Sequence, residues 1–172
     1  LPHLEMAAAG RRRLGDLVGL GASLNNIGSV HHNRGAWEKA AEYYREALSI
    51  KRSISDMRGI ASTAGNLGLI RKIQGDFRGA LRYMEEGLGI SRRIGDLTGQ
   101  CWRLLGIGVV WLDMNEFDMA EGYLSESLQM GNRIGDAPGS GIACAGLGDL
   151  YLQTGRLPEA RRFLERGIAL GN

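Results

Sequence analysis

The fold is decided by residues 15–54, which read GDLVGLGASLNNIGSVHHNRGAWEKAAEYYREALSIKRSI. The Gly-Asp pair that opens this segment returns at Gly95-Asp96 and at Gly135-Asp136, with Ser55-Asp56 in the place between them. Successive pairs start forty residues apart, so the chain contains copies of one unit without insertions or deletions. The predicted repeats are residues 15–54, 55–94, 95–134 and 135–172, and together they form one continuous domain.

Each repeat has the pattern of two helices. In the first repeat, the apolar residues at helical spacing are Leu20, Leu24, Ile27 and Val30, followed by Trp37, Ala40, Tyr44 and Leu48. Gly35 lies between the two runs and is matched by Gly75, Asn115 and Gly155. Glycine and asparagine tolerate the left-handed conformation that ends a helix, so this column is the predicted turn of a helical hairpin. The sequence therefore predicts an all-α protein.

Glycine accounts for 27 of the 172 residues, about twice its usual share of about 7%. Gly28, Gly68, Gly108 and Gly148 recur inside predicted helices, where each costs about 1 kcal/mol relative to alanine. A regular column of this kind indicates that helices touch closely at these positions. We interpret Gly19 and its equivalents in the same way.

Composition excludes several classes of protein. Hydrophobic residues make up 44%, charged residues 23%, and the net charge is +2, which argues against a disordered chain, collagen or a tail that coats nucleic acid. The apolar run Leu104–Leu112 is far shorter than the about 20 residues of a membrane-spanning helix. Cys101 and Cys144 belong to no CxxC motif, which suits a reducing compartment, and we expect a cytoplasmic protein.

The sequence predicts no enzyme active site, no metal site and no cofactor. His31 and His32 point about 100° apart on a helix, so they cannot bind a metal as a pair spaced by three or four residues does. We interpret these two residues as a solvated helix end. The Gly-x-Gly pairs do not complete a GxGxxG motif after a strand. The aspartates that open the repeats are explained as caps of the following helices.

A stripe of basic residues recurs at the predicted ends of the second helices. It consists of Arg11, Arg12, Arg13, Lys51, Arg52, Arg92, Arg93 and Arg133. Positive charge there complements the helix dipole by about 0.3–1 kcal/mol. Acidic residues offset the stripe and no aromatic residues are interleaved with it as stacking platforms, so nucleic acid is not an expected partner.

The run Leu24-Asn25-Asn26-Ile27-Gly28, followed by Gly35, Ala40, Tyr44 and Ala47, resembles the tetratricopeptide repeat pattern. The period is longer than the common 34 residues, and is similar to that of Pins-type spindle-orientation adaptors and of arrays in bacterial signalling ATPases and transcription regulators. The resemblance implies a right-handed α-solenoid of antiparallel helix hairpins. In such a solenoid the first helices line a concave groove that binds an extended or helical peptide.

The resemblance also implies which residues face the groove. These are Asn25, Asn26, Ser29, His32, Asn33, Asn66, Leu69, Trp102, Leu105, Val109, Leu112 and Asp149. The carboxamides of the first two repeats can bond to a peptide backbone, whereas the last two repeats offer apolar positions for anchor side chains. In the alternative interpretation, Asn26 and Asn66 only bridge neighbouring helices, and other parts of the protein cover Trp102 and Leu112.

We therefore expect a non-enzymatic scaffold that binds a peptide or helix of a partner protein in its groove. The alternative is a sensor or self-association arm of a larger signalling ATPase or transcription regulator. Residues 1–14 align with the end of a repeat, so we expect them to be the tail of a preceding second helix. An array cut in this way would have uncapped ends, through which a homodimer could form.

Overall fold

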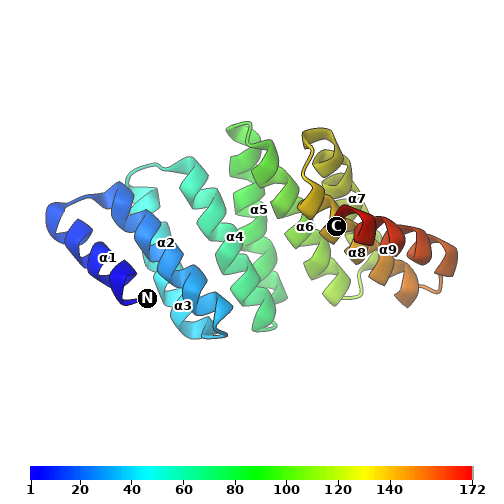
Figure 1. Ribbon diagram of the computed structural model, residues 1–172, viewed down its shortest axis with the longest axis horizontal. Coiled ribbons are helices and arrows are strands. Elements are labelled where there is room, and N and C mark those ends of the chain that lie inside the picture. The colour runs from blue at the N-terminus through cyan, green and yellow to red at the C-terminus, as the bar shows by residue number, and fades with distance from the viewer. Residues whose placement is uncertain (172) are drawn as a thin grey trace. The chain divides into compact units, whose positions relative to one another are not determined.

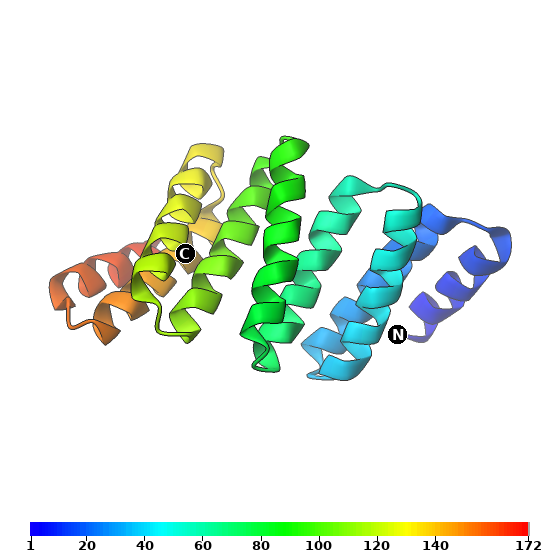
Figure 2. The ribbon, with the colours of Figure 1, turned by 180° about the vertical axis from the view of Figure 1, so that it is seen from behind.

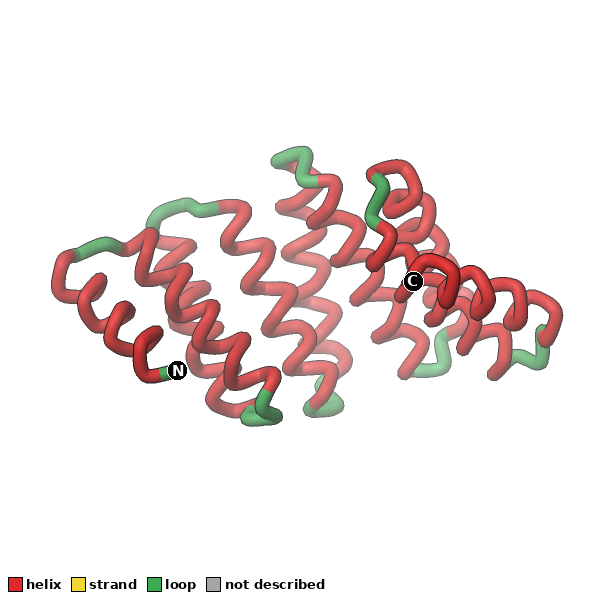
Figure 3. The backbone as a smooth tube through the Cα atoms, in the orientation of Figure 1, coloured by secondary structure: helices red, strands yellow, loops and turns green. Residues whose placement is uncertain are grey.

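The computed structural model describes residues 1–171, and this part of the chain consists of nine helices joined by short turns, with no strand (Figures 1 and 3). The helices are α1 (Pro2–Leu14), α2 (Leu17–Asn33), α3 (Trp37–Ser53), α4 (Met57–Ile73), α5 (Phe77–Arg93), α6 (Leu97–Asp113), α7 (Phe117–Ile134), α8 (Ala137–Gln153) and α9 (Leu157–Gly171). The all-α prediction is confirmed.

The chain divides into two compact units, residues 1–90 and residues 91 onward, and the division falls inside α5. In the first unit α1 packs on α2, α2 on α3, and α3 on α4. In the second unit α6 packs on α7, α7 on α8, and α8 on α9. Within each unit successive helices run antiparallel, as Figure 2 shows from behind.

Left-handed residues end the helices where the glycine columns predict them. Gly35, Gly75, Asn115 and Gly155 have φ values of 73°, 76°, 59° and 75° in the turn inside each hairpin. The column that opens the repeats is also left-handed, and at Ser55, with φ of 56°, a residue other than glycine takes this conformation. Each following aspartate then caps the next helix, as Asp16 does by accepting a bond from the Gly19 N–H at 2.9 Å.

The cap also explains the glycine column that begins at Gly19. A side chain on Gly19 or Gly59 would collide with the capping carboxylate of Asp16 or Asp56. These glycines therefore make room for the cap. They also admit a side chain of the preceding second helix, because the added methyl group would lie 2.8 Å from Arg11 Cδ at Gly19 and 2.9 Å from Lys51 Cδ at Gly59. The expectation of close helix contact holds here, and the cap is a second reason for glycine.

Close contact between helices is confirmed at the other glycine column. A methyl group on Gly28 would lie 2.7 Å from the Tyr44 ring, and one on Gly108 would lie 2.8 Å from Leu124 Cγ. Gly68 meets Met84 and Gly148 meets Leu164 in the same manner. In each hairpin, the first helix therefore presents bare backbone to a large side chain of the second helix.

A polar network joins α7 to α8 in the second unit. Tyr151 Oη donates to Glu121 Oε1 at 2.7 Å, and Arg156 Nη1 donates to Glu121 Oε2 at 3.3 Å. The Arg156 guanidinium also lies over the Tyr151 ring, 4.3 Å from its centroid. Burial, followed by the hydrogen bond to Glu121 and its charge, raises the pKa of Tyr151 to about 12 against the opposing charge of Arg156.

Replacing Gly28 by alanine is expected to lower the free energy of unfolding by about 1–3 kcal/mol, because the Tyr44 ring must move to admit the methyl group. Helix propensity alone would give the opposite sign, by about 1 kcal/mol. Urea unfolding followed by circular dichroism measures the change. The control is Gly122→Ala in α7, where nothing lies within 4 Å of the added methyl group, and where we expect a gain of about 0.5–1 kcal/mol. Equal effects at both sites would contradict a tight contact at Gly28.

The pKa of Tyr151 makes a second prediction. Because the folded-state pKa of about 12 lies above the ordinary tyrosine pKa of 10.0, this group stabilises the fold below pH 10, and its contribution is lost as the pH rises through 12. Glu121→Gln is expected to lower the pKa of Tyr151, since it removes the neighbouring charge. Carbon NMR of the tyrosine rings against pH measures this value, with Tyr151→Phe identifying the resonance. A Tyr151 pKa that does not change in Glu121→Gln would exclude the carboxylate as a cause.

Candidate functional site

The predicted groove positions of the first unit form a surface on α2 and α4, which we call the α2–α4 face. Asn26 and Asn33 are exposed on it, and Leu69 is 39% exposed. The remaining predicted residues of this face, Asn25, Ser29, His32 and Asn66, are half-buried. The apolar residues between these positions, including Leu24 and Ile27, turn toward the core. The polar residues are therefore left on the accessible side of the helices.

Hydrogen bonds hold two carboxamides of this face together. Asn66 Nδ2 donates to Asn25 Oδ1 at 3.3 Å, and Thr63 Oγ1 donates to the same oxygen at 3.0 Å. Asn66 thus bridges neighbouring helices, as the alternative interpretation states, but its partner is Asn25. Asn26 is exposed beside this pair.

A buried lysine lies beneath the α2–α4 face. Lys51, near the end of α3, is only 7% exposed, and its Nζ donates to Thr63 Oγ1 at 2.7 Å. Burial lowers the pKa of Lys51, and the charge of Asp56 partly offsets this. Arg11 makes the equivalent contact one repeat earlier, where it donates to Ser23 Oγ and to Gly19 O. Sequence reasoning missed this role because it placed Lys51 in the basic stripe.

The basic stripe, Lys51 included, is confirmed in the last turns of the second helices, and some of its arginines also form ion pairs. Arg12 pairs with Glu46, Arg52 with Glu86 at 2.6 Å, and Arg92 with Glu126 at 3.2 Å. Each pair joins one second helix to the next. Exposed pairs of this kind contribute about 0.2–1 kcal/mol each.

The two adjacent histidines have different surroundings. His32 lies against Trp37, with ring centroids 5.3 Å apart. His31 is only 8% exposed and stacks on Tyr43 at 5.4 Å. The interpretation of both as a solvated helix end is therefore wrong for His31, which lies four residues after Ile27 and shares its buried side of α2.

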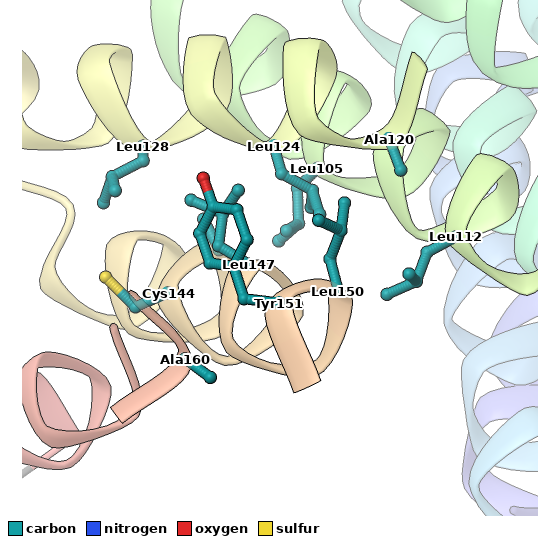
Figure 4. Packing of buried hydrophobic residues seen from close by; sticks show 11 residues of the cluster. Leu105, Leu112, Ala120, Leu124, Leu128, Cys144, Leu147, Leu150, Tyr151 and Ala160 are labelled. Atoms are coloured by element: carbon teal, nitrogen blue, oxygen red, sulfur yellow. The ribbon is translucent and has the colours of Figure 1, made fainter. Parts of the chain in front are cut away.

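The predicted groove positions of the second unit lie on α6 and α8, and we call this surface the α6–α8 face. Trp102 is 36% exposed, Asp149 is exposed and Val109 is half-buried. Leu105 and Leu112 are instead 5% and 7% exposed and belong to the core that α6, α7 and α8 share (Figure 4). This core also holds Leu124 and Leu147, so neither Leu105 nor Leu112 is available to a ligand.

The α6–α8 face also has exposed apolar residues at groove-facing columns of the fourth repeat, where Leu152 is equivalent to His32 and Leu112. Ile142 is 47% exposed and Leu152 is 48% exposed, both on α8. Their spacing on the apolar helix was visible in the sequence, but their exposure depends on how α8 is turned against α7.

A hollow of about 410 Å³ lies in the first unit, over α1 and α3. It is lined by Leu1, Glu5, His31, Lys39, Glu42, Tyr43 and Glu46. The predicted site contains none of these residues, and the lining brings three carboxylates together with a histidine and a lysine.

No group of three or more His, Cys, Asp or Glu side chains that could hold a metal ion is found among residues 1–171. No helix within the same residues is long and apolar enough to cross a membrane. Cys101 and Cys144 are both buried free thiols, and burial raises the pKa of each.

Several solved structures have the same fold. BtubC (BKLC) from P. vanneervenii aligns with a TM-score of 0.79 at 19% identity, over 97% of this chain and 78% of that protein. Aspartyl phosphate phosphatase F from Bacillus subtilis aligns with a TM-score of 0.81 at 10% identity, over 87% of this chain and 39% of that protein. The Rap conjugation gene regulator of plasmid pLS20, in complex with the Phr* peptide, aligns with a TM-score of 0.78 at 17% identity, over 90% of this chain and 43% of that protein.

These likenesses show an all-α tetratricopeptide solenoid fold. No curated protein sequence matches the chain significantly. Family models described as tetratricopeptide repeat match residues 20–55, 60–94 and 103–171, which is most of the chain. The protein therefore belongs to the tetratricopeptide repeat family.

Proposed function

We propose that the chain is a protein-interaction scaffold whose α2–α4 face binds an extended peptide segment of a partner protein. The observation that carries this proposal is the hydrogen-bonded pair of Asn25 and Asn66 on that face. Both carboxamides are held in place and half-buried, and the exposed Asn26 and Asn33 lie on the same face. Membership of the tetratricopeptide repeat family supports an interaction role, and one protein of similar fold is described in complex with a peptide.

The chemistry of the α2–α4 face matches a peptide backbone. An extended peptide presents N–H and C=O groups that are not used in secondary structure, and a carboxamide can both donate and accept. Leu69 and Ile73, one turn apart on α4, are 39% and 45% exposed. They offer apolar contact for alternate side chains of the same peptide.

The α6–α8 face offers a different contact. Trp102, Ile142 and Leu152 are exposed apolar side chains, and Asp149 supplies one negative charge. Such a surface suits aliphatic or aromatic anchors of a bound segment, with tryptophan the type of residue that most often dominates binding energy. We assign to it an apolar contact of its own, separate from the α2–α4 face.

The proposal is tested by selecting ligands from a random peptide library displayed on phage, with the 172-residue chain as target. The dissociation constants of the selected peptides are then measured by calorimetry for the wild type and for the double variant Asn26→Ala, Asn66→Ala. Each hydrogen bond contributes about 0.5–1.5 kcal/mol, so the loss of two is expected to weaken binding by about tenfold or more.

A matched control removes a carboxamide from the other side of the hairpins. Gln129→Ala, at an exposed position of α7, is expected to bind the same peptides with unchanged affinity. Circular dichroism must show equal helix content for all variants. A library that yields no binding peptide, or peptides that bind the double variant as well as the wild type, would contradict binding at the α2–α4 face.

A further inference from the structure

We propose that Lys51 is a positioning residue that sets the orientation of the Asn25 and Asn66 carboxamides, so that the α2–α4 face presents an N–H donor beside a C=O acceptor. The ligand of this donor and acceptor pair, one backbone amide group of a peptide, rests on the proposed function. The orientation itself does not, because it follows from hydrogen bonds inside the protein.

The orientation begins at the buried ammonium group of Lys51. Lys51 Nζ lies 2.7 Å from Thr63 Oγ1, and the threonine is fully buried. An ammonium group carries three hydrogens and no lone pair, so it can only donate. Lys51 therefore uses the threonine oxygen as its acceptor.

The hydroxyl group of Thr63 connects Lys51 to Asn25. A hydroxyl has one hydrogen to give, and with Lys51 donating to its oxygen, Thr63 gives that hydrogen to Asn25 at 3.0 Å. The Asn25 atom that faces Thr63 in this arrangement is the carboxamide oxygen. Lys51 occupies one of the two lone pairs of the hydroxyl and leaves its hydrogen to be donated. Without the lysine both lone pairs are open, so the hydroxyl accepts more readily from the Asn25 nitrogen and the carboxamide can turn over.

The hydrogen bond between Asn66 and Asn25 extends the fixed orientation to the second carboxamide. Asn66 Nδ2 donates to the same Asn25 oxygen at 3.3 Å, so the Asn66 oxygen is the part of its carboxamide that remains for another partner. On Asn25, the nitrogen is what remains. Both residues are half-buried, so the Asn25 amide nitrogen remains as a donor group beside the Asn66 oxygen as an acceptor, with the second hydrogen of Asn66 Nδ2 also unused by these bonds. A peptide group, with its own C=O and N–H, complements this pair.

The arrangement occurs once in the repeats. The positions equivalent to Asn25 hold Gly65, Leu105 and Ala145, and those equivalent to Asn66 include Gly106 and Gly146. Between the third and fourth repeats, the positions equivalent to Lys51 and Thr63 are Gly131 and Ala143. Lysine, hydroxyl and carboxamides therefore coincide only where α3 underlies α2 and α4.

The helix dipole favours a positive charge at this place by only about 0.3–1 kcal/mol, and it does not require that charge to be buried. The stem of Lys51 packs over backbone, since a methyl group on Gly21 would lie 3.3 Å from its Cγ. Methionine, with a chain of similar length, would make these contacts without burying a charge. What the lysine supplies and methionine does not is an obligatory donor beneath Thr63.

Neutron diffraction from deuterium-exchanged crystals distinguishes nitrogen from oxygen in a carboxamide and tests the proposal without any ligand. The wild type is expected to show Asn25 in one orientation, with its deuterated nitrogen away from Thr63. Lys51→Met is expected to show both orientations or the reverse one, and Lys51→Arg, which keeps an obligatory donor, is expected to restore the single orientation. A wild-type Asn25 with its nitrogen toward Thr63 overturns the proposal even if no variant folds. An unchanged single orientation in Lys51→Met overturns it as well.

Peptide affinity supplies the functional measurement. With peptides selected from the phage library, we expect Lys51→Met to raise the dissociation constant about tenfold, although Lys51 does not touch the ligand. For Lys51→Arg we expect the dissociation constant to change by no more than about twofold. The matched control is Lys39→Met, an exposed lysine of the same helix, which is expected to bind as the wild type does. If the wild type binds no peptide, the proposed function fails while the neutron result still decides the orientation. If Lys51→Met binds as tightly as the wild type, the positioning role fails while the proposed function stands.

Discussion

The contact on which the rest of the structure depends is the one between the central glycine of each first helix and the large side chain that faces it. Gly28 meets Tyr44, and Gly148 meets Leu164 in the last hairpin. Because bare backbone lies at the contact, the two helices approach closely, and dense packing restricts how they can be rotated against each other. That rotation decides which residues of the first helix are buried and which form an outer face.

A second layer of contacts lies between one hairpin and the next, and its chemistry differs along the chain. Lys51 reaches Thr63 beneath the α2–α4 face, whereas Leu105 joins an apolar core beneath the α6–α8 face. Carboxamides at the surface can be held by hydrogen bonds only where polar groups lie below them. The same repeat thus produces a polar face in one unit and an apolar face in the other.

The hairpins, turns, caps and close helix contacts could be predicted from the sequence because each depends on residues close together in the chain. Which residues form the α2–α4 face and the α6–α8 face was harder to predict. Asn25 and Asn26 differ by about 100° around the helix, and which of them turns toward α4 depends on how the helices pack. Leu105 and Leu112 are buried for the same reason. The role of Lys51 was hidden because a basic residue in a last helical turn has a sufficient local explanation.

A face that binds a ligand differs from one that is only accessible because its polar side chains are already held in the orientation that the ligand needs. A free asparagine side chain can present its oxygen or its nitrogen, and fixing one of the two on binding reduces affinity through lost conformational freedom. In the α2–α4 face, Thr63 and Asn66 both donate to Asn25, so the choice is made before a ligand arrives. The energetic cost of burying Lys51 is then a cost in folding stability, and the benefit is a carboxamide pair that needs no rearrangement to bind.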